Sequence, residues 1–123
     1  MARKYVGCLV LSAMVLALGK VAIAQEMKAA KTVQGEILDM ACYLDHGAKG
    51  DKHKDCAEMC IKGGAPMGLL TSDGSVYLLV ESHSKKAAYD SLKDMAAEQV
   101  KVTGVEQTRG GIRGIVVESA TKA

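Results

Sequence analysis

The chain of 123 residues has no tryptophan and no phenylalanine, and it lacks a strong excess of positive charge. Proteins that bind single-stranded nucleic acid commonly stack bases on aromatic rings, for which this chain would offer only tyrosines. The formal net charge of +2 depends on Arg3, Lys4 and Lys20 near the amino terminus. Without them, 13 basic residues face 14 acidic ones, a net charge of −1. We therefore expect no nucleic-acid partner, because such binding is largely electrostatic.

Long apolar stretches are also scarce. The apolar run over residues 6–18 follows a basic start, and it is shorter than the about 20 residues that a membrane-spanning helix needs. Residues 22–24 read Ala-Ile-Ala, the small-x-small pattern that signal peptidase recognises. We predict that residues 1–24 are a cleaved signal peptide and that residues 25–31 form a flexible tether. The protein is then exported, to the periplasm or outside the cell, with no membrane span left.

Proline and cysteine are few, and they are concentrated in one stretch, residues 42–66. It contains the only proline, three of the four cysteines and two of the three histidines. Disulfides persist in exported proteins, but one bridge among three thiols leaves one thiol over. The odd number indicates a metal, a mixed disulfide or a second chain. A small domain poor in aromatic residues is also expected to need stabilisation by a metal or a disulfide.

The spacing within this stretch favours a metal. Asp51 as N-cap and the glycines at 63–64 as C-terminal signal predict a short helix between them. His53, Cys56 and Cys60 are three and four residues apart, so they would share one face of that helix. Such a face presents two sulfurs and an imidazole to a single point.

Cys42 precedes this helix and follows an apolar run, so we place it at the end of a strand that could reach the same point. Three thiolates and one histidine are a common ligand set of structural zinc sites. Zinc is the predicted metal, and Cu(I) is the alternative because thiolates suit both. The predicted ligands are Cys42, His53, Cys56 and Cys60. Further candidate ligands are His46, Met59 and Met67.

Two alternatives to the metal remain open. Cys42 could form a disulfide with Cys56 or Cys60, leaving the third thiol free. The Cys56–Cys60 pair could instead carry thiol redox chemistry, although its spacing is one residue longer than Cys-x-x-Cys. No triad of catalytic groups accompanies the cysteines, so whether the protein is an enzyme is left open, and binding or scaffolding is favoured over catalysis.

The rest of the chain predicts a mainly β (α+β) fold. Asp73-Gly74 between apolar runs predicts a hairpin, and Ala88, Leu92 and Met95 recur with helical spacing. The predicted strands are residues 32–40, 67–71, 76–81, 99–105 and 112–118. A five-stranded barrel with one helix between strands three and four is the OB architecture. The predicted domain is 32–119, with the Cys/His insertion at 41–66 after the first strand.

Three motifs resemble a family of small exported bacterial proteins, mostly uncharacterised, that are OB-like with a Cys/His insertion after the first strand. The motifs are Gly35-x-x-x-Asp39-x-x-Cys42-Tyr43, His53-x-x-Cys56-Ala57-x-x-Cys60-x-x-Gly63-Gly64-x-Pro66 and Val102-x-Gly104. The resemblance spans nearly all of the chain expected after cleavage. The resemblance implies the fold and export but no reaction. If the protein has a binding or scaffold role, we expect a protein partner.

Overall fold

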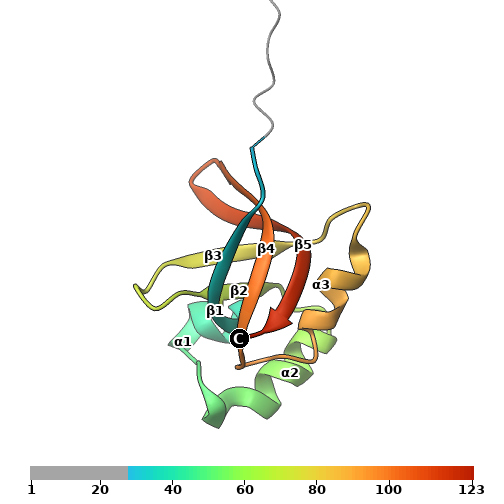
Figure 1. Ribbon diagram of the computed structural model, residues 1–123. Coiled ribbons are helices and arrows are strands. Elements are labelled where there is room, and N and C mark those ends of the chain that lie inside the picture. The colour runs from blue at the N-terminus through green and yellow to red at the C-terminus, as the bar shows by residue number, and fades with distance from the viewer. Residues whose placement is uncertain (1–27) are drawn as a thin grey trace, which may run out of the picture.

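A computed structural model describes residues 28–123, so the predicted signal peptide lies outside the described residues. Five strands and three helices follow one another in the chain (Figure 1). They are β1 (Lys31–Asp39), α1 (Met40–His46), the 3₁₀ turn η1 (Asp51–His53), α2 (Lys54–Lys62), β2 (Met67–Leu70), β3 (Val76–Val80), α3 (Lys86–Leu92), β4 (Gln99–Arg109) and β5 (Ile112–Lys122). The mainly β prediction is confirmed, and each predicted strand has its counterpart.

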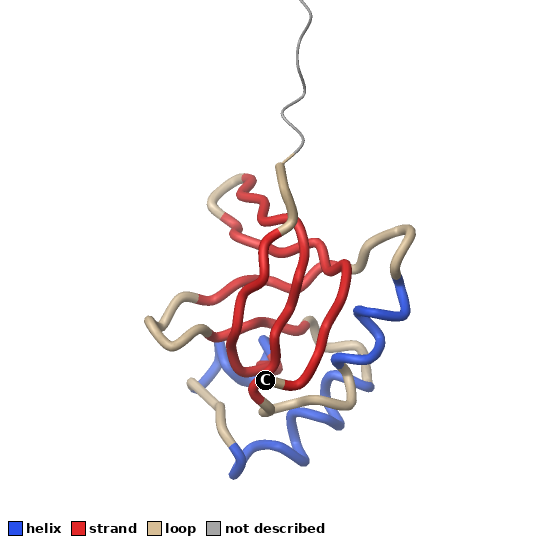
Figure 2. Tube along the Cα trace, in the orientation of Figure 1, coloured by secondary structure: helices blue, strands red, loops and turns tan. Residues whose placement is uncertain are grey.

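The five strands form one sheet closed into a ring in the order β1-β2-β3-β5-β4. Neighbouring strands are antiparallel except for β3 and β5, which run parallel. Helix α3 connects β3 to β4 and packs beside β5, whereas α2 lies across one end of the ring (Figure 1). The long β4–β5 hairpin extends at the opposite end (Figure 2).

The last two strands are longer than predicted, because β4 continues to Arg109 and β5 to Lys122. The prediction stopped where the alternating apolar pattern ends. Beyond that point the two strands still pair with each other, as in the pair Thr108 and Arg113, while their side chains are largely exposed. Backbone hydrogen bonding between adjacent strands therefore extends further than burial does.

The core fills the ring and continues under α2. Alternate residues of the strands point inward, as the two-residue period of a strand requires. Ala57 and Ile61 of α2 and Leu92 of α3 complete the cluster. The buried members are Ile37, Ala57, Ile61, Met67, Leu69, Leu79, Leu92, Ala96, Val100, Val102, Ile115 and Val117. Helix α2 thus closes one end of the ring with its own apolar face.

A carboxylate fastens the start of α2 to the sheet. Glu98, just before β4, accepts a hydrogen bond of 2.8 Å from Lys54, the first residue of α2, and its other oxygen lies 2.8 Å from the amine of Lys122 at the end of β5. The hydrogen bond from Lys122, followed by that from Lys54, lowers the pKa of Glu98 from 4.5 to about 2. The pair of lysines therefore favours the ionised carboxylate.

Glu98→Gln is expected to lower the free energy of unfolding at neutral pH, and this loss should become smaller in acid. The folded-state pKa is depressed, so the stability that Glu98 contributes is present above about pH 4.5 and is lost as the pH falls towards about 2. Denaturant unfolding of the wild-type protein and of Glu98→Gln between pH 7 and pH 2 measures this difference in unfolding free energy. Glu106→Gln is the matched control, because Glu106 has one weaker contact, 3.8 Å from Arg113. A difference between wild type and Glu98→Gln that stays constant down to pH 2 would contradict the prediction.

Candidate metal centre

Cys42 lies on a helix and not at the end of a strand. Strand β1 stops at Asp39, whose carboxylate Oδ1 accepts a hydrogen bond of 2.9 Å from the N–H of Ala41 and so caps α1. Gly47, with φ of 71°, ends α1 in the left-handed conformation that favours glycine. The predicted strand over 32–40 therefore ends one residue too late, and the strand-end position predicted for Cys42 is wrong. The N-cap chemistry of Asp39 was hidden within an apolar run.

His53 belongs to the 3₁₀ turn that precedes α2. The predicted helix start is wrong in detail, because Gly50 (φ 78°) precedes the turn and no side chain caps it. Asp51 is its first residue, and α2 begins only at Lys54. The N–H of Gly50 donates to a carboxylate oxygen of Glu36 on β1, and this bond holds the loop against the sheet. His53 consequently stands at the junction of the turn and α2.

Cys56 and Cys60 are oriented by the apolar face of α2. Each cysteine comes directly before a buried residue, Ala57 or Ile61, so it lies about 100° around the helix from the core-facing stripe. With that stripe buried under the ring, the thiols face α1 rather than the core. The predicted end of α2 is confirmed, since the N–H of Gly63 donates to the carbonyl of Met59 at 2.9 Å.

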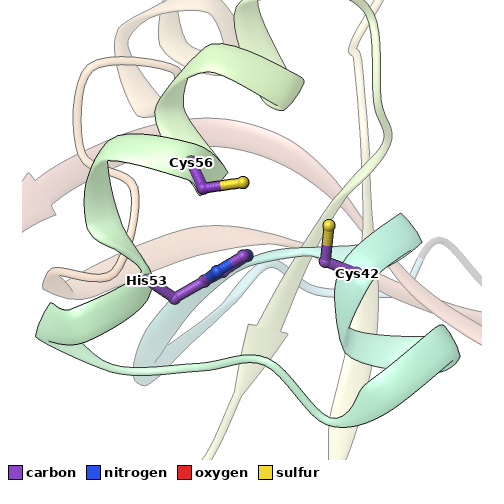
Figure 3. A group of neighbouring side chains, drawn as sticks. All are labelled: Cys42, His53 and Cys56. Atoms are coloured by element: carbon purple, nitrogen blue, oxygen red, sulfur yellow. The ribbon is translucent and has the colours of Figure 1, made fainter.

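The side chains of Cys42, His53 and Cys56 converge from α1, η1 and α2 (Figure 3). Their ligand atoms all lie within 4.8 Å of one another. In a tetrahedral zinc site, donor atoms are separated by about 3.3–3.8 Å, as follows from bond lengths of 2.0–2.3 Å. Small side-chain rotations would therefore suffice to bring all three onto one ion.

Cys42 also belongs to a second group. The ligand atoms of Asp39, Cys42 and Cys60 lie within 4.8 Å of one another as well. Among residues 28–123, the four predicted ligands thus occur in two groups that share Cys42, and not as one group of four. The structure brings all four to the same region and adds a carboxylate.

Asp39 was not among the predicted ligands. Its side chain is fully buried, and its second oxygen, Oδ2, has no hydrogen-bond partner among the described residues. His53 Nε2 is likewise buried without a partner and lies 4.0 Å from that oxygen. Carboxylates are zinc ligands too. The available signal was the Asp39-x-x-Cys42 spacing, which places an acid three residues before a cysteine.

The acidic groups in this region strongly affect one another. Burial raises the pKa of Asp39, but the nearby Cys42 thiol, the backbone N–H groups of Ala41 and Cys42, and the Cys60 thiol leave it lowered overall. The hydrogen bond to Asp39, with burial, raises the pKa of Cys42 to about 12, and burial with the charge of Asp39 raises that of Cys60. The thiols of Cys42 and Cys60 therefore keep their protons at neutral pH until a cation displaces them.

None of the three further candidate ligands belongs to either group. His46 is 57% exposed, its Nδ1 is 3.1 Å from a carboxylate oxygen of Asp45, and its ring centre is 6.2 Å from that of His53. Met59 is 72% exposed, and Met67 packs inside the ring as part of the core. These positions favour surface and packing roles for the two methionines over thioether ligation.

An apolar hollow of about 520 Å³ lies between helix α1 and the turn that joins β4 to β5. Two of its lining residues, Leu44 and Ile112, are 75% and 62% exposed. Nothing in the lining of the hollow indicates what would bind there, so the expected protein partner stays a prediction.

None of the helices described for residues 28–123 is long and apolar enough to cross a membrane. Comparisons of the chain with family models, curated proteins and solved structures found no match. The resemblance carried by the Cys/His motifs therefore stays a prediction, and the assignment of the site depends on its own geometry.

Proposed function

We propose that this chain is an exported, OB-like binding or scaffold protein that holds zinc in the insertion after its first strand. One observation carries the proposal. Three thiols, an imidazole and a buried carboxylate meet at one place, and both Asp39 Oδ2 and His53 Nε2 are buried without a hydrogen-bond partner within residues 28–123. Buried polar atoms normally find a partner, and buried charges are normally paired or bind metals. A thiophilic cation would satisfy all of these groups together.

The OB architecture is supported by the connectivity. A small five-stranded barrel in which the helix connects strands three and four is expected for that fold. Here the strand order is β1-β2-β3-β5-β4, the helix is α3, and the Cys/His insertion occupies the β1–β2 connection. This connection is one of the loops that OB proteins use for binding.

A structural role for the metal follows from the few contacts that hold the insertion, which include the Gly50–Glu36 and Lys54–Glu98 hydrogen bonds and the apolar face of α2. Helix α1 has seven residues and buries none of them fully, and α2 anchors itself mainly through Ala57 and Ile61. Helices this short are marginal by themselves. A metal bound by side chains from α1, η1 and α2 would join the three elements, and its binding energy would become folding energy.

Exposure of Cys56 supports a second candidate function, metal handling. A purely structural zinc site is closed, whereas a site that delivers its ion must be reached by an exchanging ligand. Cys56 is exposed, and Cys42 and Cys60 are partly so. Zinc or Cu(I) could then be loaded and released at this edge of the site.

Analysis of the protein purified from the export compartment tests the proposal. We expect a chain that begins at Gln25, stoichiometric zinc by elemental analysis, three free thiols after metal removal and no bound nucleic acid. A chelator should lower the melting temperature, and fast exchange with a colorimetric chelator would favour handling over a structural role. Copper in place of zinc would support the alternative metal. A metal-free protein lighter by two hydrogens, with one free thiol, would establish the disulfide instead.

A further inference from the structure

The two ligand groups have one member in common and two members each of their own. Cys42 is shared, His53 and Cys56 occur in the first group, and Asp39 and Cys60 occur in the second, with His53 Nε2 and Asp39 Oδ2 4.0 Å apart between the two groups. A thiolate has several lone pairs and can bind two metal ions at once. The shared position of Cys42 is what such a bridging ligand would require.

The charge of the region also exceeds what one ion offsets. Once cations have displaced the thiol protons, Asp39 and three thiolates would together carry four negative charges. Within residues 28–123, the only basic side chain within 4.0 Å of the Asp39 carboxylate is His53, at the limit of that distance. An isolated buried charge is costly and is normally paired or bound to a metal. One divalent ion would offset half of this charge, and two would offset all of it.

We propose that the site holds two thiophilic divalent cations, zinc in the first instance, bridged by the Cys42 thiolate. His53 and Cys56 complete the protein ligands of the first ion, and Asp39 and Cys60 those of the second. Binding releases the thiol protons to solvent. With three protein ligands each, both ions keep a coordination position open for water or for an exchanging ligand, as zinc does in its non-structural sites. The inference rests on the proposed function and extends it from one ion to two.

Zinc titration of the metal-stripped protein, read by native mass spectrometry and elemental analysis, tests the inference. The wild-type protein should take up two equivalents. Asp39→Asn keeps an oxygen that can cap α1 but removes the charge, so it should bind one equivalent. Cys60→Ser removes a different ligand of the same ion and should also stop at one, which covers the case that Asp39→Asn does not fold. Asp45→Asn, at an 84% exposed carboxylate, is the matched control and should keep two.

Cobalt substitution tests the bridge itself. Two Co²⁺ ions joined by one thiolate are magnetically coupled, so the doubly loaded protein should show a smaller electron paramagnetic resonance signal than twice that of the singly loaded one. Wild-type uptake that stops at one equivalent would overturn the inference while leaving the proposed function in place. Two equivalents in Asp39→Asn and Cys60→Ser, or fully additive cobalt signals, would also overturn it. No uptake at all would overturn the proposed function as well.

Discussion

Cys42→Ser is expected to release the metal and to lower the melting temperature more than any other single ligand replacement. Cys42 belongs to both ligand groups, whereas each other ligand belongs to one. Structural zinc binding supplies on the order of 10 kcal/mol in small zinc-dependent domains. Losing even about 3 kcal/mol would lower the melting temperature by about 12–24 °C in a domain of this size. Thermal melts with parallel metal analysis measure both effects.

His46→Ala is the control, because this imidazole is exposed and, in the described part of the chain, contacts Asp45 alone among carboxylates. A surface change of this kind alters stability by at most about 0.5 kcal/mol, or roughly 2–4 °C. In excess chelator, the wild-type protein should melt close to Cys42→Ser. The disulfide alternative predicts another pattern: two of the three cysteine variants would be equally destabilised, the third would be near neutral, and chelator would change nothing. Observing that pattern would exclude the metal.

Gly104→Ala is expected to destabilise the ring of strands directly. Gly104 follows a register shift in the β4–β5 pairing, between Thr103 and Gly104. A Cβ atom at this position would collide with the backbone carbonyl of Val116 and with the side chain of Ile115. Overpacking typically costs about 1–3 kcal/mol, and a clash with backbone belongs at the upper end because the strand itself must move. Denaturant unfolding should show a loss of about 3 kcal/mol.

Gly68→Ala is the matched control for that prediction. A Cβ atom on Gly68 would also collide, but chiefly with the end of the Met40 side chain. Met40 is only partly buried, so its flexible thioether can rotate away. We expect a loss of about 1 kcal/mol or less. Equal losses for the two variants would show that the tight approach of β4 to β5 is not what requires glycine at 104.

The scaffold could be predicted because its signals are local. The Asp73-Gly74 turn separates β2 from β3, and the helical spacing of Ala88 and Leu92 marks α3. Met95 was grouped with that helix, but α3 ends at Leu92 and Met95 lies in the turn that follows, where its N–H donates to the Leu92 carbonyl at 3.0 Å. The chain must change direction between α3 and β4, and the position of β4 decides where α3 ends.

Helix α1 was missed for a related reason. The residues from Ile37 to Met40 read as the end of a strand, and a helix of seven residues carries too short a pattern to compete with it. The carboxylate of Asp39 decides between the two by capping the first turn. That choice depends on the side chain being held in place, which the sequence pattern does not reveal.

The sequence by itself determined the segment that supplies the thiols and the imidazole, and how the two cysteines on α2 are arranged. Cys56 and Cys60 are four residues apart on α2, so helical geometry places them on one face of the helix wherever that helix lies. Only the tertiary structure decided that Cys42 is shared by two groups and that Asp39 is buried among the thiols. Both depend on α2 packing across the end of the ring through Ala57 and Ile61, which brings it against α1. Such packing results from the burial of apolar surface between distant segments, and it leaves no periodic mark on the residues that it brings together.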